Sequence, residues 1–337
     1  MRLGFLNQQI DERGTWQTYL YAKHVQRILG HSVVILFPSD PYLYGHSIWT
    51  RVTRTWACRL SARRKAAVRC YDAKIADRIT RDGVPIVETR LDANFGDFDA
   101  IYHQKYGMND GFRPRSTRYC VHAVFDASQP HGDRFAAVSS WLGRKHNVPF
   151  VPHIVEVADD SQNLRRELNI PSDAVVLGRF GGRNTFDIPW TWEAIANLLK
   201  ARQSVYFLFA NTDVKIQHER VISLPTIYDG EISLEVQKRR FINTCDVMLH
   251  VRERGETFGI AVGEFAVCGK PVLTYGKSRE RSHIEMLRQP ALYNDAAELK
   301  RCLEMAAARE LPPEDGGAYR DCTPEKVVKA FEQVFFG

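Results

Sequence analysis

The sequence predicts an α/β protein built on parallel β-sheets. Apolar runs typical of strands alternate with segments of helical periodicity along nearly the whole chain, and this alternation favours parallel sheets. Several strand-like runs, such as VVIL and VYFLFA, are apolar without interruption, as expected when helices cover both faces of a sheet. The length of 337 residues fits about two such domains.

The elements can be predicted in order from these patterns. The strands are expected at Arg2–Leu6, Ser32–Phe37, Val84–Val87, Ala100–His103, Tyr119–Ala123, Phe135–Val138, Ala174–Leu177, Val205–Phe209, Val247–His250 and Pro271–Tyr275. The helices between them are expected at Trp16–Leu29, Asp72–Arg81, Ile188–Arg202, Leu234–Thr244, Ile260–Cys268 and Ala296–Ala308. A last helix follows Thr323, which can cap it, with Pro324 at its first position and an apolar stripe that includes Phe331.

The pattern restarts near residue 150. The run FVPHIV is followed by the charged stretch Glu156–Glu167 and then by a fresh strand, which reads as a connection between domains. We predict domains at residues 1–152 and 153–320 and a C-terminal helix within 321–337. The apolar stripe of that helix must pack on a domain, and packing back on the first domain is one possibility.

Composition excludes several classes of protein. The hydrophobic fraction of 44% and charged fraction of 26% are those of a globular chain, not of a disordered, collagenous or coiled-coil one. No stretch approaches the roughly 18 apolar residues of a membrane span, and the N-terminus does not resemble a secretory signal. Seven cysteines without a C-x-x-C pair argue against a disulfide framework and favour a reducing compartment, which suggests the cytoplasm.

The net charge of +6 fits an anionic partner, such as a nucleotide, a membrane surface or nucleic acid. Residues 51–69 carry seven basic side chains and no acidic one, and Val52, Trp56 and Leu60 recur at helical spacing. This segment can be interpreted as a basic amphipathic helix that contacts anionic lipid or a charged acceptor. It can equally be interpreted as a solvated surface segment, since its cations do not separate cleanly from the apolar stripe.

The segment CDVMLHVRERGETFGIAVGEFAVCGKPVLTYG, residues 245–276, is the most informative one. Its helix Gly259–Cys268 is apolar almost all round and therefore buried, so Glu264 in its middle needs hydrogen-bond donors, which a ribose diol could supply. Glu256 precedes the helix, whose N-terminus suits a diphosphate, and Gly255 would allow close approach of a ligand. The alternative is that Glu256 caps the helix and Glu264 pairs with a buried arginine.

The run ETFGIAVGE, followed by CGKP, resembles the E-x7-E motif of retaining GT-B glycosyltransferases of family four. This resemblance implies two Rossmann-like domains with parallel sheets facing a cleft, with the nucleotide sugar held mainly by the C-terminal domain. It implies that Glu256 contacts hydroxyls of the donor sugar and that Glu264 contacts the ribose. Thr257, Phe258 and Gly259 are expected at the donor as well.

The run VVLGRFGG is similar to the strand that opens the donor domain in this family, which makes Arg179 the expected phosphate-binding arginine. The family usually has a lysine five residues later, where this chain has Asn184. Arg183, Arg252 or Arg254 could replace its charge. The alternative for Arg179 is an ion pair at the surface.

In the first half, YCVHAVF places His122 near the end of a predicted strand, where open α/β sheets bind ligands. It resembles a strand-end histidine that faces the donor sugar in related enzymes, although a lone histidine is often structural. His103, with Lys105 beside it, is a weaker candidate. Gly14 matches one glycine of a loop that is usually richer in glycine and that borders the acceptor or the diphosphate.

The resemblance implies transfer of a sugar from a nucleoside-diphosphate donor to a hydroxyl of a glycan, lipid or other acceptor, with retained configuration and no cofactor. No metal is expected, because no ligand spacing occurs and Asp97-Phe98-Asp99 fits a turn. The absence of G-x-G-x-x-G after the first strand counts against a dehydrogenase. An inactive sugar-nucleotide-binding protein ranks second, and a DNA-base glucosyltransferase ranks last.

Overall fold

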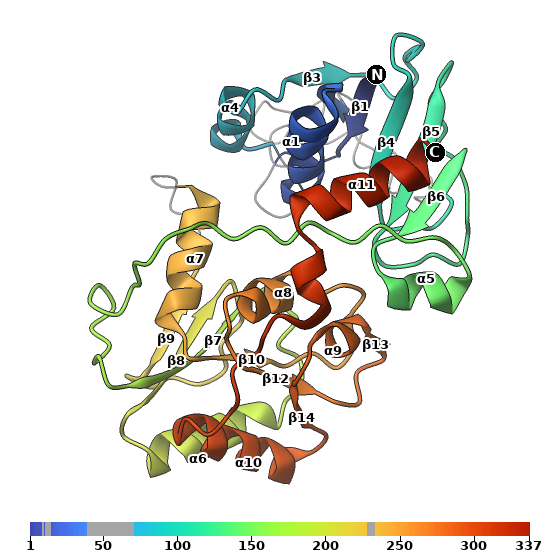
Figure 1. The fold of residues 1–337 in the computed structure, drawn as a ribbon. Coiled ribbons are helices and arrows are strands. Elements are labelled where there is room, and N and C mark those ends of the chain that lie inside the picture. The colour runs from blue at the N-terminus through green and yellow to red at the C-terminus, as the bar shows by residue number, and fades with distance from the viewer. Residues whose placement is uncertain (9, 11–14, 39–70, 228–232) are drawn as a thin grey trace, which may run out of the picture. The chain divides into compact units, whose positions relative to one another are not determined.

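The computed structural model describes residues 1–8, 10, 15–38, 71–227 and 233–337, and it divides into two compact units (Figure 1). Unit 1 consists of Met1–Ile154 together with Thr323–Gly337, and unit 2 consists of Val155–Cys322. The chain thus passes from unit 1 to unit 2 and back again. The boundaries expected from the sequence, 152/153 and 320/321, fall just before these two passages.

Unit 1 is built on a six-stranded parallel sheet with the order β3-β2-β1-β4-β5-β6. The strands are β1 Arg2–Leu6, β2 Ser32–Pro38, β3 Ile86–Thr89, β4 Ala100–Lys105, β5 Arg118–Ala123 and β6 Arg134–Ala137. The order reverses at β1, which pairs with β2 on one side and β4 on the other. Such a reversal is the place where open α/β sheets bind ligands.

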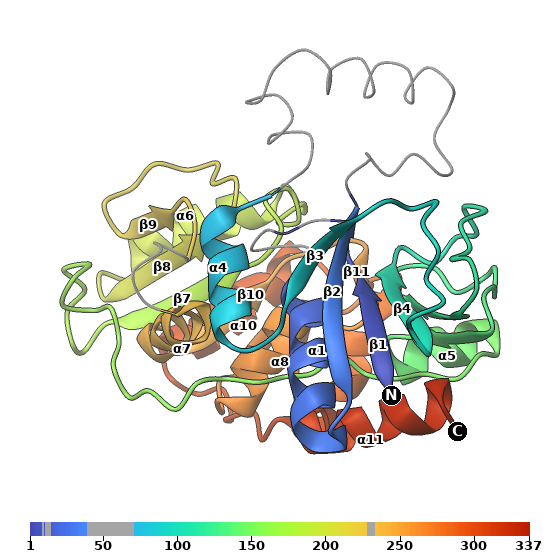
Figure 2. The ribbon, with the colours of Figure 1, turned by 90° about the horizontal axis from the view of Figure 1, so that it is seen from above.

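The described helices of unit 1 are α1 Trp16–Leu29, α4 Ala73–Arg81, α5 Ser140–His146 and α11 Pro324–Phe335. Helix α11 lies beside α1, as the two views in Figures 1 and 2 show. Its Phe331 and Phe335 are fully buried, and the Phe331 ring packs against the rings of Phe5 and Tyr102 from the centre of the sheet. The end of the sequence therefore completes the core that its beginning starts.

Unit 2 repeats the architecture with a second six-stranded parallel sheet, in the order β14-β12-β10-β7-β8-β9. Its strands are β7 Val175–Phe180, β8 Val205–Ala210, β9 Val221–Leu224, β10 Val247–His250, β12 Val272–Tyr275 and β14 Ala291–Tyr293. Two short strands, β11 Gly255–Glu256 and β13 Glu280–Arg281, pair with each other outside this sheet.

The helices of unit 2 are α6 Thr191–Ala201, α7 Leu234–Thr244, α8 Ile260–Val267, α9 Ser282–Met286 and α10 Ala296–Ala307, with a 3-10 turn η1 at Gly317–Asp321. Helices α6 and α10 lie side by side on one face of the sheet, where Leu199 and Leu303 pack with Phe207. Helices α7 and α8 lie on the other face, where Phe241 and Phe265 surround Phe180.

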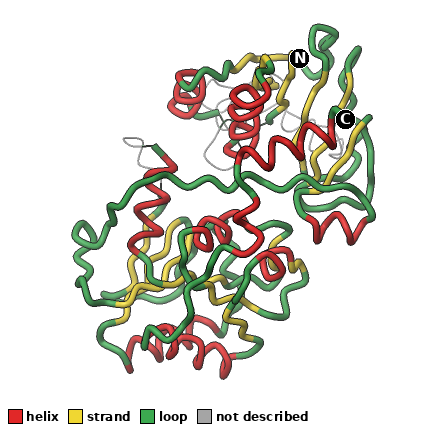
Figure 3. The backbone as a smooth tube through the Cα atoms, viewed as in Figure 1, coloured by secondary structure: helices red, strands yellow, loops and turns green. Residues whose placement is uncertain are grey.

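The predicted α/β class with parallel sheets is confirmed, and every strand and helix predicted from the sequence has a counterpart in the structure. Figure 3 shows in addition elements that the patterns did not reveal, among them the edge strands β9 and β14 and the short helices α5 and α9. None of the helices in the described parts of the chain is long and apolar enough to cross a membrane.

Candidate functional site

Glu256 lies in β11, in the connection between β10 and α8. Its carboxylate accepts a hydrogen bond from Arg252 Nη1 at 2.6 Å and lies 3.3 Å from His250 Nε2, and its side chain is 21% exposed. Burial on its own would raise the pKa of Glu256, but the hydrogen bond of His250 and the charge and hydrogen bond of Arg252 oppose it, and the pKa is lowered to about 2. Glu256 is therefore a carboxylate with a partly accessible face.

A row of buried polar side chains continues behind Glu256. His250 Nδ1 lies 2.8 Å from Thr274 Oγ1, which in turn lies 3.0 Å from His283 Nε2. His250 and Thr274 are register partners on the parallel strands β10 and β12, so their side chains share one face of the sheet. His283 follows β13, the partner strand of β11, and this pairing brings it to the same place. The sequence patterns did not reveal these three residues as site residues.

Helix α8 begins at Ile260, and Gly259, which has φ = 87°, is its N-cap residue and forms no side-chain cap. A Cβ atom at this position would lie 3.0 Å from both the His283 Cβ and the Tyr319 hydroxyl, and the left-handed backbone favours glycine in any case. Thr257 and Phe258 are buried, and the Phe258 carbonyl accepts a hydrogen bond from the Tyr319 hydroxyl at 2.6 Å. The turn between Glu256 and α8 is thus fixed by contacts within unit 2.

Glu264 lies in the middle of α8 and its side chain is 4% exposed. Its Oε1 accepts a hydrogen bond from Lys238 Nζ of α7 at 2.7 Å, whereas its Oε2 has no hydrogen-bond partner within the described ranges. Burial raises the pKa of Glu264, and the charge of Lys238 opposes this rise. The expectation that the buried acid needs a donor is met in part, and its partner is a lysine where the alternative interpretation had an arginine.

Arg179 stands near the end of β7 and is 3% exposed. Its guanidinium donates hydrogen bonds to the hydroxyls of Thr212 and Thr185 and lies over the ring of Phe186, with 5.5 Å to the centroid. Because Arg179 is buried, it does not lie at the surface as the alternative of a surface ion pair requires, and the described residues form no ion pair with it. Burial lowers the pKa of Arg179 to about 10, against the charge of Glu256, which raises it.

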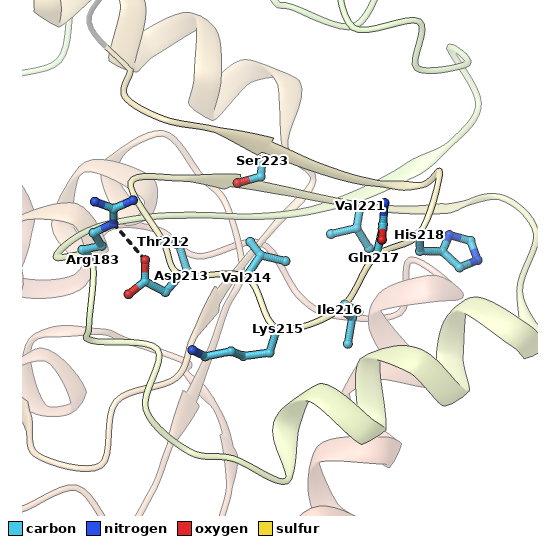
Figure 4. Close-up of a pocket in the computed structure, with 10 residues that line it drawn as sticks. All are labelled: Arg183, Thr212, Asp213, Val214, Lys215, Ile216, Gln217, His218, Val221 and Ser223. Atoms are coloured by element: carbon cyan, nitrogen blue, oxygen red, sulfur yellow. Dashed lines mark hydrogen bonds and ion pairs between the residues drawn. The ribbon is translucent and has the colours of Figure 1, made fainter.

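The arginines considered as substitutes for a lysine at Asn184 are differently placed. Arg183 is 70% exposed and its Nε donates to Asp213 at 2.8 Å, as the dashed line in Figure 4 marks. Both residues line a cavity of about 560 Å³. Thr212, the partner of Arg179, lines it too, together with Val214, Lys215, Ile216, Gln217, His218, Val221 and Ser223 (Figure 4). Arg252, by contrast, is bound to Glu256.

His122 has no exposed surface. Its Nδ1 lies 2.7 Å from the Tyr102 hydroxyl and its Nε2 lies 2.8 Å from the Val151 carbonyl, so both ring nitrogens are used inside unit 1. Burial lowers the pKa of His122 to about 4 and keeps the ring neutral. We therefore assign His122 a structural role, which is the alternative that the sequence left open.

His103 is also buried, and its Nδ1 lies 2.8 Å from the Tyr119 hydroxyl. Lys105 forms an ion pair with Asp110 at 2.5 Å and lies 3.3 Å from His131 Nε2. Gly14 and residues 51–69 lie outside the described residues. Among the residues that are described, no group of three or more His, Cys, Asp or Glu side chains is placed to hold a metal ion.

Comparisons with known proteins yield matches among solved structures only: no family model and no curated protein matches this chain. HepE from Anabaena, in its complex with UDP-glucose, matches with a TM-score of 0.59 and 12% identity over 99% of this chain and 95% of that one. A glycosyltransferase from Rickettsia africae matches with a TM-score of 0.56 and 10% identity over 99% and 94%. Sucrose-phosphate synthase from Thermosynechococcus elongatus matches with a TM-score of 0.53 and 10% identity over 99% and 95%.

These likenesses extend over nearly the whole chain in each case, and they show its fold. The protein has the two-sheet α/β fold of GT-B glycosyltransferase structures, which confirms the fold expected from the resemblance. At 10–12% identity they do not carry the assignment to family four, nor the roles of the two glutamates.

Proposed function

We propose that this protein is a retaining, metal-independent glycosyltransferase that moves a sugar from a nucleoside-diphosphate donor to a hydroxyl group. The observation that carries the proposal is Arg179, a buried guanidinium bound to neutral hydroxyls and a carbonyl. The described residues form no ion pair with Arg179, and a buried charge without a directly bound counter-charge is costly, so such an arginine is best explained by an anion that arrives with a ligand.

The anion is proposed to be the diphosphate of the donor. The planar guanidinium matches phosphate oxygens, and the free N–H groups at the N-terminus of α8 suit the same charge. Preorganised donors of this kind stabilise the negative charge that builds on a leaving diphosphate, and removal of one typically costs about 3–4 kcal/mol of transition-state stabilisation.

The two glutamates would hold the rest of the donor. Glu264 Oε2 is a buried acceptor to which none of the described residues donates, and a ribose hydroxyl would supply the missing hydrogen bond. Glu256 is ionised and partly exposed, so it can accept hydrogen bonds from hydroxyls of the transferred sugar. Arg252 and His250 fix the direction of its carboxylate.

The test is a panel of donors read by released nucleoside diphosphate. UDP-glucose comes first, because HepE was solved with it, followed by GDP-mannose and ADP-glucose. The wild type should release nucleoside diphosphate from at least one donor. Glu256→Ala should bind that nucleoside diphosphate with the wild-type affinity but should cleave the donor at least 100-fold more slowly. Arg179→Met should lose the affinity for the nucleoside diphosphate. Turnover of Glu256→Ala at the wild-type rate would contradict the assignment.

A second candidate function is sugar-nucleotide binding without transfer. Asn184 favours it, because Arg183 is tied to Asp213 and does not supply the usual second cation next to Arg179. Binding of a donor by calorimetry, with no release even at high enzyme concentration, would support this reading over transfer.

The acceptor is proposed to be a glycan or lipid hydroxyl in the cytoplasm, with residues 51–69 as a peripheral contact to an anionic membrane. A screen of free oligosaccharides, anionic vesicles and duplex DNA distinguishes the options. If DNA were the acceptor, binding to it would fall steeply with salt, since counterion release drives such binding.

A further inference from the structure

We infer that Thr274 and His283 act as positioning residues for Glu256, through a one-way chain of hydrogen bonds. The chain runs from Glu256 Oε1 to His250 Nε2 (3.3 Å), from His250 Nδ1 to Thr274 Oγ1 (2.8 Å) and from Thr274 Oγ1 to His283 Nε2 (3.0 Å). The inference rests on the proposed function, because it concerns the carboxylate that would hold the donor sugar.

The first end of the chain fixes the direction of its hydrogens. Glu256 is ionised, so the nitrogen that faces it, His250 Nε2, must carry a hydrogen. With the ring hydrogen on Nε2, the other nitrogen, Nδ1, accepts the single hydrogen of the Thr274 hydroxyl. With its hydrogen used in this way, the Thr274 oxygen can only accept from His283, whose Nε2 must be the donor.

The other end of the chain agrees with this direction. His283 Nδ1 is buried and has no hydrogen-bond partner among the residues that the structure describes. If the chain ran in reverse, this nitrogen would carry a hydrogen without an acceptor, and buried N–H groups without partners are rare. Burial holds the pKa of His283 well below its usual value, so the ring is neutral and Nδ1 is a bare lone pair.

The chain of hydrogen bonds explains how Glu256 keeps one orientation on the short connection between β10 and α8. Thr274 has no exposed surface and His283 has none, so their positions are set by the packing of β12 and α9. They hold the His250 ring in one tautomer and one plane, and the ring in turn holds Oε1. Arg252 holds Oε2 from the other side at 2.6 Å. A carboxylate fixed in this way presents its remaining lone pairs to the sugar in a single geometry.

The inference is tested with Thr274→Val, which keeps the shape of the side chain and removes the hydroxyl, and with Thr274→Ser, which keeps the hydroxyl. Thr191→Val is the matched control, because Thr191 is equally buried in unit 2 but its hydroxyl has no partner in the part of the chain that the structure describes. The probes are the donor among UDP-glucose, GDP-mannose and ADP-glucose that the wild type cleaves fastest, and the nucleoside diphosphate it releases.

Thr274→Val should lower kcat roughly 10- to 100-fold, as small displacements of a catalytic group do, and leave the Kd of the nucleoside diphosphate unchanged. Thr274→Ser and Thr191→Val should keep at least half of the wild-type kcat. Wild-type kcat in Thr274→Val, in an enzyme that otherwise turns over its donor, would overturn the inference and leave the proposed function standing. If the wild type cleaves no donor, the proposed function fails and the positioning role fails with it.

Nitrogen NMR of histidine-labelled protein gives a second readout that does not depend on activity. His250 and His283 should both carry the ring hydrogen on Nε2, and Thr274→Val should remove the hydrogen-bond shift of His250 Nδ1. A hydrogen on Nδ1 of either ring in the wild type would overturn the inference.

Discussion

At the scale of single residues, the charge state of the candidate site depends on which partners each buried group has. Glu256 and Glu264 lie in the same motif, yet the pKa of Glu256 is lowered to about 2 by His250 and Arg252, and the pKa of Glu264 is raised by burial. The pKa values of the two acids are thus shifted in opposite directions. Glu256 can only accept hydrogen bonds, and Glu264 combines a paired oxygen with an unpaired one.

The lowered pKa of Glu256 predicts a pH-dependent contribution to stability. Unfolding returns the pKa of the Glu256 carboxyl from about 2 to its ordinary value of 4.5. The stabilisation of the folded state is therefore present above pH 4.5 and is lost as the pH falls toward 2. At neutral pH it amounts to about 3 kcal/mol, at 1.36 kcal/mol for each unit. Glu256→Gln removes it, so the stability difference between wild type and variant should shrink between pH 5 and pH 3.

Urea unfolding of both proteins across this range measures the difference. The raised pKa of Glu264 has the opposite sign, but it is common to both proteins and cancels. A difference of equal size at pH 6 and pH 3.5 would show that the ion pairs of Glu256 do not stabilise the fold.

At the scale of elements, the position of α8 depends on one small residue. Gly263 faces the ring of Tyr319 in η1, and a Cβ atom there would lie only 2.5 Å from that ring. Gly263→Ala gains about 1 kcal/mol of helix propensity but overpacks the contact, which typically costs about 1–3 kcal/mol. We expect a net loss of stability of about 1 kcal/mol, measured by urea unfolding.

The control for this prediction is the same substitution in a Tyr319→Ala background. With the ring removed, Gly263→Ala should become neutral or stabilising, because only the gain in helix propensity remains. A loss of stability that persists in the double variant would mean that another contact limits the size of residue 263.

Elements were more predictable from the sequence than the site was. Strands buried on both faces, such as β2 and β8, are continuous apolar runs and stand out, whereas the edge strands β9 and β14 are short and partly exposed. Glu256, Glu264 and Arg179 could be proposed as candidates from the sequence because they follow a motif. Lys238 could not, since it lies on α7, 26 positions before Glu264, and only the packing of α7 and α8 joins them.

His122 also shows that sequence patterns predict an element better than the surroundings of a side chain. Its place near the end of β5 could be predicted, but the face of the sheet on which its side chain lies could not. That face is covered by α1 and α11, whose Tyr21 and Phe335 rings contact the imidazole. A shift of one residue along a strand moves a side chain to the opposite face, so strand position alone does not assign function.

At the scale of the whole molecule, the chain builds unit 1 from its two ends. Phe331→Ala in α11 should destabilise unit 1 by about 3–5 kcal/mol, because the ring fills space between Phe5, Tyr21 and Tyr102. Hydrogen exchange should then speed up in β1 and β4 and remain unchanged in β7 and β8. Gln333→Ala, at an exposed position of the same helix, is the control and should change neither unit. Equal loss of protection in both units would show that they unfold together.

The place of α11 in the sequence also sets an order for folding during synthesis. Residues 1–154 leave the ribosome first, but the helix that closes their core is made only after all of unit 2. At about 5–20 residues per second, that delay is on the order of 10–40 seconds. Throughout it, the nascent N-terminal half exposes the apolar surface that Phe331 and Phe335 later cover, so it is the half that would depend on chaperones.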